Sequence, residues 1–122
     1  MSHVRILEML DRAHQGPLCT SKEWSTRVIP QTVASKIKEY DLKGACDREN
    51  PVNQDDALAD KFFKAGYELA LELGFLCLET ERIIKATEDE IKDAMKNGPS
   101  ELILGYGRDR VVFRHRTFED PF

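Results

Sequence analysis

The 122 residues are enough for one domain, and their 33% charged and 41% hydrophobic content is typical of soluble globular proteins. The formal net charge of −4 excludes the overall basic charge that binding to nucleic-acid phosphates requires. The longest apolar run, Leu69 to Leu78, is far shorter than the roughly 20 residues of a membrane helix, so we expect no membrane contact and a cytoplasmic protein.

The chain contains three cysteines, Cys19, Cys46 and Cys77, which are odd in number and widely spaced. They fit neither a disulfide framework nor a paired metal motif, so we expect three reduced thiols. Cys77 lies in an apolar run and is expected to be buried and inert. The three histidines are scattered over the chain, and their spacing predicts no metal site.

Helical spacing of apolar residues predicts a first helix over residues 3–13. A capping box of Thr20 and Glu23 then predicts a short helix that stops before Pro30. Proline suits the first turn of a helix, where its missing N–H needs no partner, so Pro30 predicts another helix that ends near Tyr40.

Residues 41–54 are rich in polar and turn-forming residues and predict an exposed loop. The helix over 55–73 has the clearest apolar stripe, and Gly74 is placed to end it with a left-handed cap. We expect this helix to organise the core by burying large side chains, among them Phe62, Phe63, Leu69 and Leu73.

Residues 75–78 and 82–85 are short apolar runs that predict a small antiparallel pair. A second capping box predicts a helix over 88–97, which Gly98 ends. Residues 102–104 and 110–116 flank a glycine-rich turn and predict a hairpin, with 117–122 as a frayed tail or linker.

The turn of this hairpin, Gly105-Tyr-Gly107-Arg108-Asp109, is the most suggestive short motif. It lacks the third glycine and the following helix of a dinucleotide fingerprint. Two interpretations stay open: a structural turn, or a contact for a ligand or partner through Gly105, Gly107, Arg108 and Asp109. Arginines near the C-terminus are expected to form a solvated strand face more often than a binding surface.

Three segments of the chain, KAGYELALELG, CLETERIIKATEDEI and LGYGRD, resemble in order the N-terminal region of the corrinoid-dependent, pyrrolysine-containing monomethylamine methyltransferases. The resemblance implies an α+β fold that is mainly helical with a small antiparallel hairpin. In that family the region precedes a (β/α)8 barrel, which needs at least about 200 residues and is absent from these 122. We expect residues 1–122 to form a single N-terminal segment.

The family resemblance also implies a function, which is methyl transfer from monomethylamine to the cobalt of a corrinoid carried by a partner protein. It further implies a homo-oligomer. The family's catalytic residues lie in the barrel, so we expect no catalytic, cofactor-binding or metal residue in this segment, and no activity from the segment alone. The alternative is a free-standing small domain that binds another protein.

Overall fold

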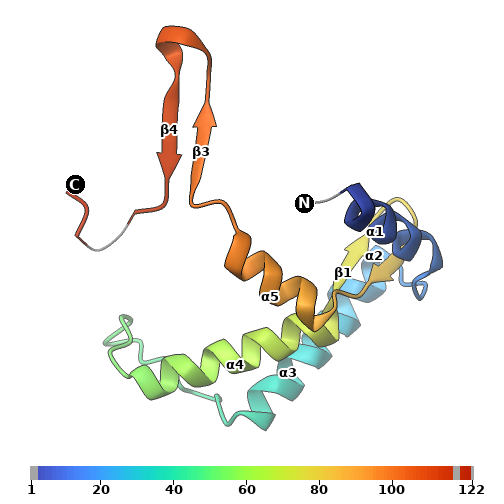
Figure 1. The fold of residues 1–122 in the computed structure, drawn as a ribbon. Helices are drawn as coiled ribbons and strands as arrows, with labels where there is room; N and C mark the ends of the chain where they lie inside the picture. The colour runs from blue at the N-terminus through green and yellow to red at the C-terminus, as the bar shows by residue number, and fades with distance from the viewer. Residues whose placement is uncertain (1–2, 117–118, 122) are drawn as a thin grey trace. The chain divides into compact units, whose positions relative to one another are not determined.

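A computed structural model describes residues 3–116 and 119–121, and the chain divides into two compact units, one up to Thr87 and one from Glu88 onward (Figure 1). The first unit holds four α-helical segments and a small sheet, and the second holds one helix and one hairpin. This mixture of helices and antiparallel strand pairs is the expected α+β class. The prediction that residues 1–122 act as one segment stays a prediction.

The first unit begins with α1 (His3–Gln15), which packs against β2. The chain then runs extended past Pro17 to Thr20, whose hydroxyl accepts a hydrogen bond of 3.1 Å from the Glu23 amide. This bond satisfies one amide that the first helical turn would otherwise leave unpaired. The Thr20 half of the predicted capping box is therefore confirmed as the start of α2 (Ser21–Glu23), while the bond observed for the Glu23 carboxylate is one that it accepts from Arg27.

The predicted break before Pro30 is wrong, because α2 continues without interruption through a π-helical turn, η1 (Trp24–Val28), into α3 (Ile29–Glu39). Proline has no N–H and its ring crowds the preceding turn, and a wider turn just before it relieves that crowding. Hydroxyl groups satisfy nearby carbonyls: Thr26 donates to the Lys22 oxygen at 2.7 Å and Thr32 to the Val28 oxygen at 2.7 Å. Pro30 therefore lies inside one continuous helical segment that consists of α2, η1 and α3.

The long helix α4 (Asp56–Leu73) is held at both ends by features visible in the sequence. The Asp55 carboxylate accepts hydrogen bonds from the amides of Ala57 at 2.9 Å and Leu58 at 3.2 Å. At the other end Gly74 has φ +68°, and a Cβ there would clash with the carbonyl oxygen of Ile84. Glycine is therefore required where α4 turns into the sheet.

The core of the first unit is built from small and medium side chains, and its buried residues are Ala13, Cys19, Leu42, Ala65 and Ile84. The expected burial of the large rings of α4 is wrong, since Phe62 is 41% exposed and Phe63 58% exposed. The helix α4 packs against α3 and buries the small side chain of Ala65, whereas the two rings are exposed. Leu69 and Leu73 are half-buried.

The sheet of the first unit pairs β1 (Phe75–Cys77) with β2 (Arg82–Ile84) in antiparallel register, as predicted. The sequence did not indicate that the chain around Leu18 bridges to Arg82 on the other side of β2. Two backbone bonds hold it there, from the Cys19 amide to the Glu81 oxygen at 2.8 Å and from the Ile83 amide to the Pro17 oxygen at 2.9 Å. Because these bonds are backbone to backbone, no side-chain pattern marks them.

Side chains add further ties between helices and sheet. Arg12 of α1 donates to the Lys85 carbonyl oxygen at 2.7 Å, and Lys85 in turn donates to the Glu72 carbonyl oxygen at the end of α4. The end of β2 is therefore connected to both helices. Among the described residues no helix is long and apolar enough to cross a membrane.

The second unit contains α5 (Glu88–Asn97), β3 (Glu101–Leu104), a 3₁₀ turn η2 (Gly107–Asp109) and β4 (Val111–Arg114). The helix and the hairpin are confirmed close to their predicted bounds. Both strands form a two-stranded ladder, with no further strand beside it in the described part of the unit. The predicted tail or linker lies partly outside the described residues, which omit 117, 118 and 122.

Candidate functional site

The candidate turn lies at the tip of the β3–β4 hairpin, and the structure shows why it is rich in glycine. Gly105 has φ +83° and Gly107 has φ +61°. A Cβ on Gly105 would clash with the Asp109 carbonyl oxygen, whereas Gly107 has open space around it. The Asp109 amide donates to the Tyr106 oxygen at 3.2 Å and closes the turn. Both glycines and Asp109 therefore act through their backbone to shape the tip.

The side chains of the turn point to no catalytic arrangement. Tyr106 is 94% exposed, and Arg108 and Asp109 are exposed as well. Within the described ranges, neither the Arg108 guanidinium nor the Asp109 carboxylate has a hydrogen bond or ion pair. The structural-turn interpretation is supported by the backbone, and a partner contact through these side chains stays a prediction.

The strands behind the turn present two different faces. Cross-strand partners point to the same side of a ladder, and successive residues alternate between sides. Leu102 pairs with Phe113 and Leu104 with Val111, and we call these four residues the apolar face. The pairs Glu101–Arg114 and Ile103–Val112 form the opposite, mixed face. All eight side chains are exposed in the isolated chain.

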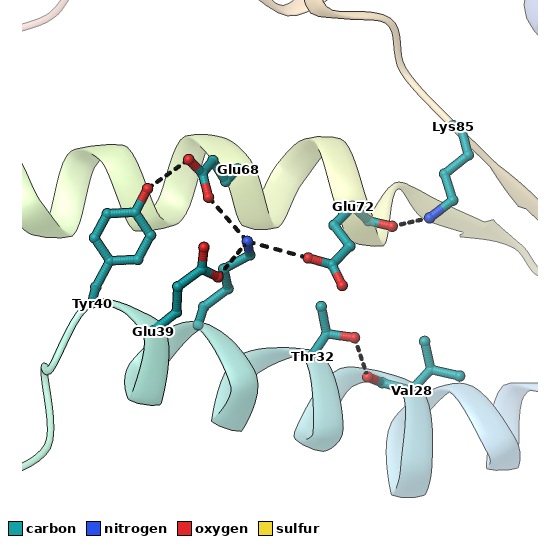
Figure 2. Close-up of polar contacts among 8 residues, drawn as sticks. Val28, Thr32, Glu39, Tyr40, Glu68, Glu72 and Lys85 are labelled. Carbon is teal, nitrogen blue, oxygen red and sulfur yellow. Dashed lines mark hydrogen bonds and ion pairs between the residues drawn. The ribbon is translucent and has the colours of Figure 1, made fainter.

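A polar cluster joins α3 to α4 in the first unit (Figure 2), and sequence reasoning missed it. The Lys36 ammonium lies 2.9 Å from a carboxylate oxygen of Glu39, 3.0 Å from Glu68 and 3.4 Å from Glu72. The Tyr40 hydroxyl donates to the other Glu68 oxygen at 2.6 Å. Helical spacing could have suggested two polar faces, one from residues 36, 39 and 40 and one from 68 and 72, but not that they meet.

The pKa shifts within this cluster favour the protonation states in which Lys36, Glu68 and Tyr40 bond to one another. The hydrogen bonds that the Lys36 ammonium donates to the carboxylates of Glu39 and Glu68, in that order of effect, raise the pKa of Lys36 well above its ordinary value. The Tyr40 hydroxyl, followed by Lys36, lowers the pKa of Glu68, and the same bond to Glu68 raises the pKa of Tyr40. A lysine that stays charged and engaged with three carboxylates is unsuited to act as a base or nucleophile at neutral pH.

The remaining reactive side chains form no second candidate site. Across residues 3–116 and 119–121 no group of histidine, cysteine and carboxylate side chains could hold a metal ion. The three cysteines are free, with Cys19 buried and Cys46 exposed. Cys77 is only half-buried, so the expected burial of this thiol is wrong, while its lack of reactivity stays a prediction.

The sequence and the fold are similar to those of monomethylamine methyltransferases. The family model described as monomethylamine methyltransferase MtmB matches residues 4–122. Monomethylamine methyltransferase MtmB1 of Methanosarcina barkeri is 40% identical over 115 residues, which are 93% of this chain and 24% of that protein. MtmB of Methanosarcina mazei is also 40% identical over 115 residues, with the same coverage. The chain belongs to the monomethylamine methyltransferase MtmB family.

Solved structures support the same assignment. The crystal structure of the Methanosarcina barkeri enzyme superposes with a TM-score of 0.74 at 38% identity, covering 91% of this chain and 24% of that one. The structure of a hydroxylamine complex of MtmB gives the same values. The resemblance to the family's N-terminal region and the α+β fold class are thereby confirmed. The chain spans about a quarter of the length of these relatives.

Proposed function

We propose that this chain is the N-terminal part of a methylamine:corrinoid methyltransferase, which moves the methyl group of monomethylamine to the cobalt of a corrinoid protein. The observation that carries the proposal is the match to monomethylamine methyltransferase MtmB over residues 4–122, at 40% identity to MtmB1 of Methanosarcina barkeri. Identity at this level along 115 residues, with a TM-score of 0.74, supports a shared structural role for the segment.

The role we propose for the segment is architectural. Its polar cluster at Lys36 contains a lysine that is held charged by three carboxylates and that links two helices. Its candidate turn is shaped by backbone hydrogen bonds and by glycines with positive φ. We propose that the chemistry belongs to the other three quarters of the family's length, that the corrinoid is held by a partner protein, and that the enzyme acts as a cytoplasmic homo-oligomer.

A chimera tests the proposal directly. Residues 4–122 of this chain replace the matched region of MtmB1 from Methanosarcina barkeri, and methyl transfer from monomethylamine to a corrinoid protein is followed by the cobalamin absorbance spectrum. We expect the chimera to form methyl-cobalt, because a segment of the same fold should support the same catalytic body. The recipient with its matched region deleted serves as the control and should be inactive.

The outcome that contradicts the proposal is a chimera that folds cooperatively, as shown by circular dichroism, but transfers no methyl group. A second assay uses the isolated 122-residue chain with monomethylamine and the same corrinoid protein. We expect no methyl-cobalt from the chain alone. Steady formation of methyl-cobalt by the isolated chain would show that the segment itself carries catalytic groups.

The alternative function is a small domain that binds another protein by itself. The observation that favours it is the first unit, which is compact and has its own small core of buried residues, as a domain that folds without a larger body would have. Light scattering across a dilution series, with binding of a hydrophobic dye, separates the two functions. A monomer at every concentration that binds no dye would favour the self-sufficient domain, whereas self-association favours a segment that lacks its neighbour.

A further inference from the structure

We propose that the apolar face of the β3–β4 hairpin docks on the part of the family's polypeptide that follows the matched region in the relatives. This inference rests on the proposed function, because it requires that the segment works within a methyltransferase of the family's length. It adds which face of the hairpin is covered, and which part of the protein covers it.

The hairpin cannot cover its own apolar face. Leu102, Leu104, Val111 and Phe113 are 54%, 46%, 53% and 62% exposed, and they stand on one side of the ladder. A two-stranded hairpin is marginally stable in water unless further strands or another layer pack on it. None of the described residues of the second unit is buried, so the described part of the unit contains no layer that packs on the hairpin.

The mixed face is the side suited to water. There Glu101 and Arg114 stand directly opposite each other at the open end of the ladder, beside the single apolar pair Ile103–Val112. Cross-strand pairs of opposite charge are stable on a solvated surface, whereas covering them would require removal of water from both ions. The difference in charge between the two sides therefore selects the apolar face for docking.

The position of the hairpin within the relatives' sequences indicates which part of the polypeptide covers the apolar face. The matched region covers 24% of the relatives, and β4 ends at Arg114, eight residues before the match ends at 122. Eight residues span at most about 28 Å even when fully extended, so whatever follows begins close to the hairpin. A short connection gives the two parts an effective concentration in the millimolar range, which exceeds that of a separate copy at micromolar concentration.

The experiment compares two variants at adjacent positions of β3 whose side chains point to opposite sides. Leu102→Cys places a thiol on the apolar face, and Ile103→Cys places one on the mixed face. Each is made in the isolated chain and in the chimera with Methanosarcina barkeri MtmB1. The rate of alkylation at the new thiol is read from the modified peptide by mass spectrometry, so that the three native cysteines do not interfere.

We expect alkylation of the Leu102→Cys variant to be at least about tenfold slower in the chimera than in the isolated chain, since packing excludes the reagent. The Ile103→Cys variant should react at similar rates in both. Equal rates for Leu102→Cys in both proteins, or protection of Ile103→Cys instead, would overturn the inference. Protection of Leu102→Cys in the isolated chain that grows with its concentration would also overturn it, by identifying a second copy as the occupant.

Failure of this inference can be told apart from failure of the proposed function. A chimera that transfers methyl groups while Leu102→Cys stays fully reactive refutes the docking alone. A chimera that is inactive while Leu102→Cys is protected refutes the proposed function and leaves the docking supported. If the chimera is insoluble, the isolated variants are mixed with the relative lacking its matched region, and the same difference in protection between Leu102→Cys and Ile103→Cys decides the question.

Discussion

The two units of the chain are stabilised by different kinds of interaction. In the first unit, helix ends, backbone bonds and side chains converge on the short strand β2, and five residues are buried. In the second unit the hairpin is closed by its own backbone, and its apolar side chains are exposed. Hydrogen bonds between residues that are distant in the sequence, more than large apolar side chains, therefore hold the first unit together, whereas the hairpin of the second unit is closed by bonds between its two adjacent strands.

The strongest way to break the first unit is to separate α4 from β2. Gly74→Ala should destabilise it by at least about 2 kcal/mol, because the residue has positive φ and a Cβ would clash with the Ile84 carbonyl oxygen. Gly66→Ala is the matched control within α4, where a Cβ meets open space, and should stabilise the unit by about 0.5–1 kcal/mol. Urea unfolding measures both, and equal midpoints would contradict the role of Gly74.

The contribution of the large rings on α4 should be intermediate. Phe62→Ala is expected to cost about 1–2 kcal/mol, less than the 3–5 kcal/mol or so of a fully buried ring, because the side chain is 41% exposed. Lys64→Ala, on an exposed position of the same helix, should stay within about 0.5 kcal/mol. Thermal unfolding followed by circular dichroism gives both values. A cost for Phe62→Ala above that of Gly74→Ala would show that apolar burial dominates after all.

The polar cluster between α3 and α4 should make the first unit sensitive to acid. The pKa of Glu68 is lower in the folded chain than its ordinary value of 4.5, so its contribution is present above that pH and is lost as the pH falls through the lowered value. The pKa of Tyr40 is raised above 10.0, so its contribution is present below that pH and is lost as the pH rises further.

Urea midpoints at pH 7, 5, 4 and 3 test the acid side of this prediction. Glu68→Gln should flatten the decline at acid pH, and Asp60→Asn, which removes one exposed carboxylate from the same helix, serves as the control for the loss of a negative charge. A decline that is unchanged in Glu68→Gln would mean that other carboxylates dominate acid unfolding.

The smallest effect on global stability is expected at the hairpin tip. Gly105→Ala introduces a clash with the Asp109 carbonyl oxygen at φ +83°, while Gly107→Ala meets open space at φ +61°. Both variants should leave unfolding of the first unit unchanged within about 0.5 kcal/mol, because the tip belongs to the other unit. Hydrogen exchange of the β3–β4 amides should accelerate more in Gly105→Ala than in Gly107→Ala. A fall in the midpoint of the first unit would show that the two units are coupled.

Local signals in the sequence predicted most elements correctly. The Thr20 cap, the end of α4 at Gly74 and the hairpin around Gly105 each depend on residues within a few positions of one another, so their physics is visible in the sequence. The candidate turn was found for the same reason. The family resemblance supplied the overall class, which local patterns alone do not determine.

The features that were missed depend on distant parts of the chain. Lys36 meets Glu68 across 32 residues, and the bridge at Leu18 uses backbone groups that carry no sequence signature. The exposure of Phe62 depends on what packs over α4, which an apolar stripe does not specify. The π-helical turn accommodates Pro30 within a continuing helix. The sequence predicted a break there because proline inside a helix usually kinks or ends it.

That turn has a consequence for how the chain tolerates insertions and deletions. Each residue of an α-helix advances the chain by about 100° around its axis. Deleting one residue within Trp24–Val28 would restore regular winding only by rotating the Thr20 cap and the extended chain at Leu18 relative to α3. The π-helical turn thus changes the rotation of the helix about its axis. Because of this rotation, the start of the continuous α2–α3 segment is aligned with the sheet and its last turns are aligned with α4.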